Sequence, residues 1–188
     1  PGDYNADGKT DLAIGAYGYS TSTGRAYLFY NDGSIPTTAA TADVIITGET
    51  TNNFFGTSFA SGDFNADGTT GLAIGAYGYS SFTGRAYIFN NDGSIPTTAA
   101  TADTFITGEA SSNSFGIALT AGDFNADGRV DLAIGAYGYS SNTGRAYLFY
   151  NDGSIPATAA TADVIISGEG TSNYFGYVIT AADFNADG

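Results

Sequence analysis

Hydrophobic residues along the chain fall in short runs separated by polar, Gly-rich stretches. In the first sixty residues these runs cover Leu12–Tyr19, Arg25–Tyr30, Val44–Thr47 and Phe55–Phe64. The second run alternates its aromatic and other side chains with period two, as a β-strand does. The run Asn31-Asp32-Gly33 supplies the positive φ angles of a tight turn. The pattern predicts four short strands and an all-β chain.

Polar turns and small residues help to define where the predicted strands begin and end. A polar turn at Ser20–Gly24 separates the first two strands, and Thr37–Ala42 is too short and uncapped for more than a helical turn. Ala13, Gly15 and Ala16 suit a strand whose backbone lies very close to its neighbours near a central axis. A bulge or a close sheet contact is the alternative for these small residues.

One pattern repeats along the whole chain. The string Asp-[Tyr/Phe]-Asn-Ala-Asp-Gly begins at Asp3, Asp63, Asp123 and Asp183, at intervals of 60 residues. The strings LAIGAYGYS, TGRAY, NDGSIP and Phe-Gly keep the same register. Four strands per repeat predict β-propeller-type blades of four antiparallel strands. We expect one array with repeats at 3–62, 63–122 and 123–182 and a partial fourth at 183–188.

The repeated acidic loop has the ligand chemistry of a calcium site. In the first copy Asp3, Asn5, Asp7 and Asp11 place side-chain oxygens at relative positions 1, 3, 5 and 9, and a Gly turns the chain. The backbone carbonyl of Lys9 adds an oxygen at position 7. Hard oxygen ligands, six to eight of them, are what Ca²⁺ prefers. We therefore predict a Ca²⁺ site here.

The other three copies of the loop differ in how many of these ligands they contain. The third repeats the full set, whereas the second has Gly71 in place of the fourth carboxylate, which predicts a weaker site. The fourth copy ends at Gly188 and is incomplete as given. The candidate ligands are Asp63, Asn65, Asp67 and the Thr69 carbonyl; Asp123, Asn125, Asp127, the Arg129 carbonyl and Asp131; and Asp183, Asn185 and Asp187.

The loop shares features with two other motifs. An EF-hand requires a bidentate Glu at position 12, where this chain has Ile14 and Ile134. The EF-hand is therefore excluded. An Asx-turn hairpin, whose side chains bond to their own backbone, remains as the alternative. Ten of the sixteen Asp residues lie in these four loops, and clustered carboxylates repel one another unless a cation offsets them.

These motifs resemble the FG-GAP repeat of integrin α-subunit β-propellers and many bacterial surface proteins. The second copy carries the resemblance in Phe55-Gly56, Gly62–Gly68, Leu72–Ala76 and Gly84–Tyr87, and it recurs across the whole chain. The family implies four-stranded blades around a central axis, with Ca²⁺ in the hairpin loop between two strands. Its calcium ligands fall on the residues already named.

The chain departs from the family in two ways. Tyr17, Tyr77 and Tyr137 stand where the family usually has the proline of its Gly-Ala-Pro element, and the copies are unusually uniform. Three repeats also fall short of the four to eight blades that close a propeller. We expect closure to need further repeats of a longer chain, other copies of the chain, or head-to-tail stacking. The strand expected at Tyr174–Asp183 would complete a first blade in the same chain or in another.

Composition and charge exclude several functions. The 188 residues include five Lys and Arg against nineteen Asp and Glu, a formal charge of −14, and no His, Cys, Met or Trp. The usual thiol and His-based catalytic groups and zinc ligands are therefore missing. So few cations do not form a nucleic-acid surface, and no apolar run is long enough for a membrane span. Every acidic pair is either a candidate calcium ligand or repeated identically in each copy, whereas a catalytic site is normally singular, so we predict a chain that is not an enzyme.

Tyrosines and arginines recur once or twice per repeat. Tyr17 and Tyr19 lie two apart, on one face of the first predicted strand, where they would stack on sugar rings or fill space between blades. We expect Arg25 and its equivalents to form ion pairs with carboxylates like Glu49 at blade edges. The candidate ligand-binding tyrosines are Tyr17, Tyr19, Tyr77, Tyr79, Tyr137 and Tyr139.

The leading hypothesis is a non-catalytic, extracellular or cell-surface, calcium-binding FG-GAP module with a structural or adhesion role. It would assemble with other copies or further repeats into a ring or filament, with glycans or surface proteins as further partners. The alternative is a lectin-like propeller that binds glycans through its tyrosines.

Overall fold

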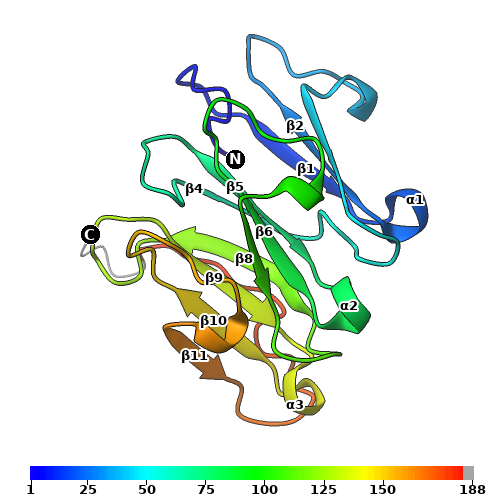
Figure 1. The fold of residues 1–188 in the computed structure, drawn as a ribbon, viewed down its shortest axis with the longest axis vertical. Helices are drawn as coiled ribbons and strands as arrows, with labels where there is room; N and C mark the ends of the chain where they lie inside the picture. Colours follow the sequence, from blue (N-terminus) through cyan, green and yellow to red (C-terminus); the bar gives the residue numbers. More distant parts are fainter. Residues whose placement is uncertain (184–188) are drawn as a thin grey trace.

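The computed structural model describes residues 1–183 as three antiparallel β-sheets lying in a row (Figure 1). Sheet 1 has the order β1-β2-β3, with β1 at Leu12–Ala16, β2 at Arg25–Phe29 and β3 at Val44–Thr47. Sheet 2 joins β4 (Phe59–Gly62), β5 (Gly71–Ala76), β6 (Arg85–Phe89) and β7 (Thr104–Thr107) in that order. Sheet 3 contains β8 (Phe115–Gly122), β9 (Asp131–Ala136), β10 (Arg145–Phe149) and β11 (Val164–Ser167). The predicted all-β architecture with four-stranded blades is confirmed.

Sheets 2 and 3 each draw strands from two consecutive repeats. β4 precedes the second acidic loop and pairs with β5, which follows it, with Gly62 opposite Gly71. In sheet 1 the corresponding position is held only by Gly2, which bridges to Asp11. Sheet 1 therefore has three strands, and the sheets are offset from the 60-residue sequence frame.

The first strand of the repeat ends earlier than expected. It stops at Ala16, and Tyr17 and Tyr19 do not lie on one strand face. The reason is local, because Ser20, Thr21 and Ser22 have φ angles between 47° and 58°, which a strand does not accommodate. The short segments that follow are α1 (Tyr19–Ser22), α2 (Tyr79–Phe82) and α3 (Tyr139–Asn142). Single 3₁₀ turns at Ala39–Thr41, Ala99–Thr101 and Ala159–Thr161 confirm the predicted helical turn.

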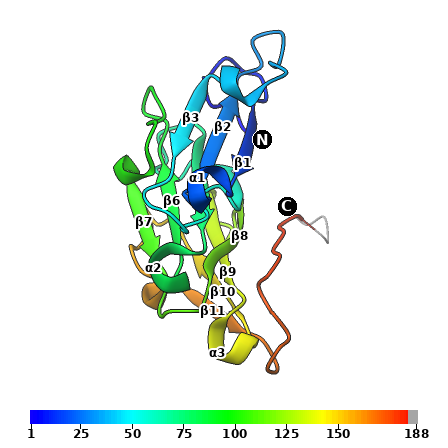
Figure 2. The ribbon, with the colours of Figure 1, turned by 90° about the vertical axis from the view of Figure 1, so that its right-hand side faces the viewer.

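The strand before the second loop is shorter than predicted, the strand before the third spans Phe115–Gly122, and the strand before the fourth is missing. Phe55–Phe64 contains a strand only at Phe59–Gly62. The stretch Tyr174–Asp183 forms no strand, contrary to expectation. In sheets 2 and 3 the strand before the loop pairs with the strand that follows the loop. The segment runs as a separate trace beside sheet 3 (Figure 2).

Close backbone contact explains the small residues of the first strand. A Cβ atom at Gly15 would collide with the carbonyl oxygen of Gly56. A Cβ atom at Gly75 would likewise collide with the carbonyl oxygen of Gly116, and one at Gly135 with that of Gly176. The structure therefore shows the close contact that was the alternative for these small residues: Gly15, Gly75 and Gly135 each pack on the Gly of the following Phe-Gly pair.

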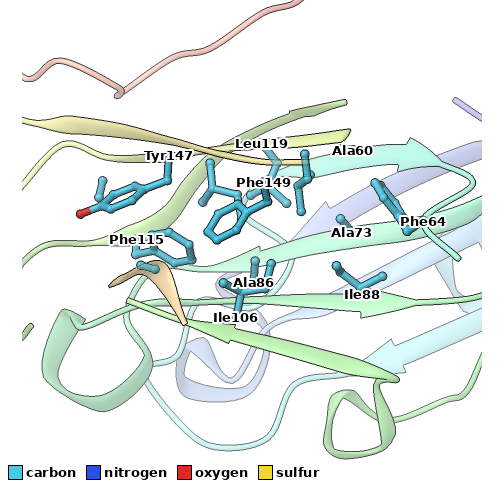
Figure 3. Close-up of a cluster of buried hydrophobic side chains, with 14 residues drawn as sticks. Ala60, Phe64, Ala73, Ala86, Ile88, Ile106, Phe115, Leu119, Tyr147 and Phe149 are labelled. Atoms are coloured by element: carbon cyan, nitrogen blue, oxygen red, sulfur yellow. The ribbon is translucent and has the colours of Figure 1, made fainter. Parts of the chain in front are cut away.

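The hydrophobic core lies between the sheets. At the junction of sheets 2 and 3, Phe115 packs edge-on against Tyr147 and Phe149, with ring centroids 5.4 and 6.4 Å apart (Figure 3). Phe55 makes the same contacts one junction earlier, on Tyr87 and Phe89. Edge-to-face aromatic pairs add about 1 kcal/mol each to the burial of their area.

The outer faces of the row remain open. The three sheets do not close into a ring within residues 1–183, as the repeat number predicts (Figures 1 and 2). No helix in that range is long and apolar enough to cross a bilayer.

Candidate metal centre

The first acidic loop, loop 1 (residues 3–11), gathers its side-chain oxygens around three backbone amides. The N–H of Asp7 lies 3.1 Å from Asp3 Oδ1 and 3.1 Å from Asn5 Oδ1. The Gly8 N–H donates to Asp3 Oδ2 at 2.8 Å, and the Lys9 N–H donates to Asp7 Oδ1 at 2.9 Å. Gly8 has a φ of 83°, which lets the chain turn back over these oxygens. Three candidate ligands therefore lie on one side of a tight loop.

Asp11, the fourth candidate ligand, is a buried residue at the end of loop 1. Its side chain is 1% exposed, and its two oxygens accept from the Tyr4 N–H at 2.7 Å and the Asn31 N–H at 2.8 Å. Asn31 belongs to the turn after β2. The carboxylate therefore ties loop 1 to a neighbouring turn and satisfies two backbone donors that would otherwise be buried without partners.

The third loop, loop 3 (residues 123–131), repeats this arrangement. The Asp127 N–H lies 3.1 Å from Asp123 Oδ1 and 3.0 Å from Asn125 Oδ1. Asp131 is fully buried and accepts from the N–H groups of Phe124 and Asn151, both at 2.8 Å. Loops 1 and 3 therefore share one architecture, as the sequence predicts.

The second loop, loop 2 (residues 63–71), keeps the outer part and lacks the buried carboxylate. Asp67 Oδ1 accepts from the Thr69 N–H at 2.7 Å and from Thr69 Oγ1 at 2.6 Å. The Asn65 side-chain amide donates to Asp67 Oδ2 at 2.8 Å. At Gly71 no side chain takes the place of Asp11 and Asp131.

Hydrogen bonding keeps two of these carboxylates ionised. The backbone N–H of Lys9, followed by its ammonium group 3.3 Å away, lowers the pKa of Asp7. The Thr69 hydroxyl, with the Asn65 amide and the Thr69 N–H, lowers the pKa of Asp67. Both carboxylates are therefore charged at neutral pH and available to a cation.

The hydrogen bonds also keep the Asx-turn interpretation open. Within residues 1–183 no group of three or more acidic side chains is already arranged to hold a metal ion. Each carboxylate oxygen has two lone pairs, so an oxygen that accepts one backbone N–H keeps a second site for a cation. The donor set fits a hard divalent cation, and the same residues serve as turn-forming acceptors when none is bound.

The fourth loop lies mostly beyond the described residues. Asp183 is exposed. Asn185 and Asp187 are outside the part of the chain that the structure describes.

Two asparagines connect neighbouring loops and were not singled out from the sequence. Asn91 Nδ2 donates to the Tyr4 carbonyl of loop 1 at 2.9 Å, and its own carbonyl accepts from Thr69 Oγ1 of loop 2 at 2.7 Å. Asn151 donates its N–H to Asp131 of loop 3 and its Nδ2 to the Asp63 carbonyl at 3.4 Å. Both belong to the repeated Asn-Asp-Gly string, but that string is typical of an ordinary turn and does not indicate a contact with another loop.

The candidate tyrosines divide into two sets. Tyr79 and Tyr139 lie under guanidinium groups, with Arg85 and Arg145 carbons 3.6 and 3.5 Å from the ring centroids, and Tyr19 lies 3.8 Å from Arg25 in the same way. The other set gathers with neighbouring aromatic rings. Tyr77 stacks on Phe54 at 4.8 Å, Tyr17 lies 6.2 Å from Phe54, and Tyr137 packs edge-on to Tyr177 at 5.2 Å.

Two of the three predicted ion pairs are present, and Arg25 pairs with no carboxylate within residues 1–183. Arg85 Nη1 lies 3.4 Å from Glu49 Oε2, and Arg145 Nη1 lies 2.9 Å from Glu109 Oε2. Each Glu also accepts from a tyrosine hydroxyl, that of Tyr87 at 3.1 Å and that of Tyr147 at 3.0 Å. The pairs join consecutive sheets.

Comparison with known proteins agrees with this architecture. The FG-GAP repeat family matches at residues 1–29, 55–89 and 115–149, which together make up more than half of the chain. A phosphatidylinositol-glycan-specific phospholipase D from Homo sapiens is 31% identical over 93% of this chain, and integrin alpha-PS2 from Drosophila melanogaster is 32% identical over 89%. Integrin alpha-IIb from Mus musculus is 36% identical over 73%.

The matches involve only part of each relative. The chain spans 23% of the phospholipase D, 12% of integrin alpha-PS2 and 14% of integrin alpha-IIb. The shared part is the repeat array, whose Phe-Gly and Gly-Ala motifs meet between sheets in this structure. The chain belongs to the FG-GAP repeat family.

Proposed function

We propose that this chain is a non-catalytic, calcium-stabilised structural module that works outside the cell or at its surface. The observation that carries the proposal is the arrangement of loops 1 and 3. In each, two oxygen-bearing side chains converge on one backbone amide, and a buried Asp fixes the base of the loop. Membership of the same family as integrin alpha subunits supports the location and the adhesion role.

Calcium would act on the fold and not on a substrate. The chain carries a formal charge of −14, and much of it is concentrated in the loops. A divalent ion offsets the repulsion between loop carboxylates and binds the folded loop in preference to the unfolded chain. In this proposal Asp3, Asn5, Asp7, the Lys9 carbonyl and Asp11 hold the ion in loop 1.

The same ligand positions extend to the other loops. Loop 3 uses its matching set and binds with similar strength, whereas loop 2 binds more weakly because Gly71 supplies no carboxylate. The matching positions are Asp123, Asn125, Asp127, the Arg129 carbonyl and Asp131 in loop 3, and Asp63, Asn65, Asp67 and the Thr69 carbonyl in loop 2.

The non-catalytic part of the proposal rests on repetition. The acidic groups recur in equivalent positions, and catalytic constellations normally occur once in a domain. The phospholipase D is named for a reaction, and the chain spans less than a quarter of that protein. The structural role therefore accounts for the features that the repeats share.

Direct calcium titration tests the proposal. Isothermal titration calorimetry on chelator-treated protein should show two sites of similar affinity and a weaker third, with Mg²⁺ binding less tightly. The matched variant is Asp7→Asn together with Asp127→Asn, which preserves side-chain size and removes one charge from each strong loop. Absence of heat with Ca²⁺ at millimolar concentration would refute calcium binding and leave the Asx-turn interpretation.

Glycan binding is the second candidate, and one observation favours it. Tyr17 is 55% exposed and lies beside Phe54 and Tyr77, which form an aromatic patch at one end of the junction between sheets 1 and 2. Rings of this kind stack on sugars. A glycan array with the wild-type chain and with Tyr17→Ala tests it, and absence of any binding to the wild type would remove this candidate.

A further inference from the structure

Asp-Gly pairs occur in two different settings within each repeat. One pair lies in the acidic loop, and the other lies in the Asn-Asp-Gly turn that follows β2, β6 or β10. All six pairs are exposed, so exposure does not distinguish the two settings. The loop pairs are Asp7-Gly8, Asp67-Gly68 and Asp127-Gly128, and the turn pairs are Asp32-Gly33, Asp92-Gly93 and Asp152-Gly153. A seventh pair, Asp187-Gly188, lies outside the described residues.

An Asp-Gly pair can rearrange without an enzyme. The Gly nitrogen attacks Cγ of the preceding Asp in its carboxylic acid form. A C–N bond forms, the bond from Cγ to the hydroxyl breaks, and the hydroxyl leaves with the N–H proton as water. Water then opens the resulting succinimide ring, either at Cγ, which restores Asp, or at the main-chain carbonyl, which gives isoaspartate. Gly favours the attack because it has no Cβ to obstruct the approach.

In the acidic loops both reacting groups are held by hydrogen bonds. The Gly8 N–H donates to Asp3 Oδ2 at 2.8 Å, and Asp7 Oδ1 accepts from the Lys9 N–H at 2.9 Å. Both bonds have to break before the Gly nitrogen can reach Cγ and give up its proton. The same two bonds recur in loops 2 and 3, from Gly68 to Asp63 and Gly128 to Asp123, both at 2.8 Å, and from Thr69 to Asp67 at 2.7 Å and Arg129 to Asp127 at 2.8 Å.

In the Asn-Asp-Gly turns the same groups are free. Within residues 1–183, neither the Asp side chain nor the Gly N–H of any turn pair has a hydrogen-bond or ion-pair partner. The space around the Gly is also open. A Cβ atom added at Gly33 or Gly93 would meet no atom within 4 Å, and one at Gly153 would meet only Arg129 Nη1, at 3.6 Å. The side chain can therefore rotate onto the Gly nitrogen without losing a contact.

We propose that the three turn pairs are the sites at which this chain forms isoaspartate, and that the hydrogen bonds of the acidic loops protect the loop pairs. The fold thereby divides six copies of one dipeptide into two chemical classes. The protected class includes candidate calcium ligands, whose carboxylates keep their place in the loop. The division does not require a metal, because the protecting bonds are made by the chain itself.

The reactive turns adjoin residues that connect neighbouring loops. Asn91 immediately precedes Asp92; its Nδ2 donates to the Tyr4 carbonyl, and its own carbonyl accepts from Thr69 Oγ1. Isoaspartate adds one carbon atom to the main chain at the next residue, which displaces the turn that positions Asn91. An aged sample should therefore melt at a lower temperature than a fresh one.

The test is ageing of the folded chain in EDTA at physiological temperature and weakly acidic pH. Tryptic fragments are then analysed by electron-transfer fragmentation, which distinguishes isoaspartate from aspartate at equal mass. Trypsin cleaves after Arg25 and Arg85, so Asp32 and Asp67 fall in one fragment, and the next fragment likewise holds one turn pair and one loop pair. Isoaspartate should accumulate about tenfold or more faster at the turn residue, because the loop must first open locally.

Variants and solvent separate the fold from the local sequence. Asp32→Glu should abolish the reaction at that turn, because Glu would have to close a six-membered ring, and should leave Asp92 unchanged. Asp3→Ala removes the acceptor of the Gly8 N–H and should raise isoaspartate at Asp7, with Asp127 as the unchanged control. In concentrated urea the contrast between turns and loops should disappear. A repeat in Ca²⁺ should leave the rates at the turns unchanged, so the result does not depend on calcium binding.

Four results would overturn the proposal. They are equal rates at Asp32 and Asp67 in the folded chain, faster reaction in the loops than in the turns, no isoaspartate at the turns, and a contrast that persists in urea. In the last case the residues around each pair, and not the fold, would set the rates.

Discussion

Loops 2 and 3 share the string Asp-Phe-Asn-Ala-Asp-Gly and differ in how they are anchored. Loop 3 ends in Asp131, which is buried and accepts two backbone N–H groups, whereas loop 2 ends in Gly71. Loop 2 uses Thr69 instead, whose hydroxyl joins Asp67 to the Asn91 carbonyl. The fold therefore tolerates loss of the buried carboxylate when another side chain ties the loop to the adjacent turn.

The comparison distinguishes two roles of the last Asp of the loop, which the sequence alone does not distinguish. The last Asp of the loop is a candidate calcium ligand, and it is also a buried structural acceptor. Its second role does not require a metal, because the Phe124 and Asn151 amides are its partners in the structure as described. The following experiments test this separation, beginning with the largest expected effect.

Chelation should have the largest effect. If loops 1 and 3 each bind calcium, a free concentration one hundred times the dissociation constant stabilises the fold by about 2.7 kcal/mol per site. Removing calcium with EDTA should then lower the melting temperature by about 10–20 °C, measured by circular dichroism. An unchanged melting temperature, with Mg²⁺ held constant as the control, would contradict the calcium role of both loops.

Asp131→Ala should be costly even without calcium. It leaves the Phe124 and Asn151 N–H groups without an acceptor, at a cost of about 3 kcal/mol in the free energy of unfolding. Urea denaturation in EDTA measures this metal-independent part, with Asp127→Ala as the control in the same loop. A loss that appears only when calcium is present would mean that Asp131 acts solely through the metal.

Asp127→Ala and Asp67→Ala should differ in calcium and resemble each other in EDTA. The first removes a ligand from a loop that keeps its buried Asp, and the second removes one from a loop that lacks it. We expect the first to lose about 5–10 °C of calcium-dependent melting temperature and the second clearly less. Equal losses would contradict the ranking of the two loops.

Gly71→Asp should convert loop 2 toward the loop 3 arrangement, with a smaller effect. The new carboxylate gains the positions that Asp131 occupies, but its Cβ lies 2.8 Å from the Phe89 carbonyl oxygen, so the backbone must shift. We expect tighter calcium binding at this loop by calorimetry and a change in stability within about 1 kcal/mol. Unchanged affinity would show that the fourth carboxylate does not set the strength of the site.

Thr69→Val should have the smallest effect, seen as a change in acid titration. The hydroxyl lowers the pKa of Asp67 below its ordinary value of 3.8, so the stabilisation is complete above that value and is lost as pH falls through the lower folded pKa. Removing the hydroxyl should raise the Asp67 pKa, measured by NMR titration in EDTA. Asp127, whose neighbour is Arg129, is the internal control; a shift of equal size there would contradict a local cause.

The sequence predicted the loops well because their chemistry is local. The ligand positions lie within nine residues, and the Gly turn and the Asx hydrogen bonds between neighbours follow from that short range. It predicted the strand ends less well. Leu12–Tyr19 read as one strand, but three successive residues with positive φ end it at Ala16, and nothing in their side chains requires that conformation.

The sequence by itself determined the 60-residue period, the all-β class, the acidic loops and the failure of three repeats to close. Tertiary structure alone decided that sheets 2 and 3 each combine two repeats, that Asn91 and Asn151 join neighbouring loops, and that identical residues are buried in one copy and exposed in another. Ile14 and Ile74 are the same residue in the same string, yet one is 47% exposed and the other is fully buried. Burial depends on which sheet packs against a face, and a repeated sequence specifies the face without specifying its neighbour.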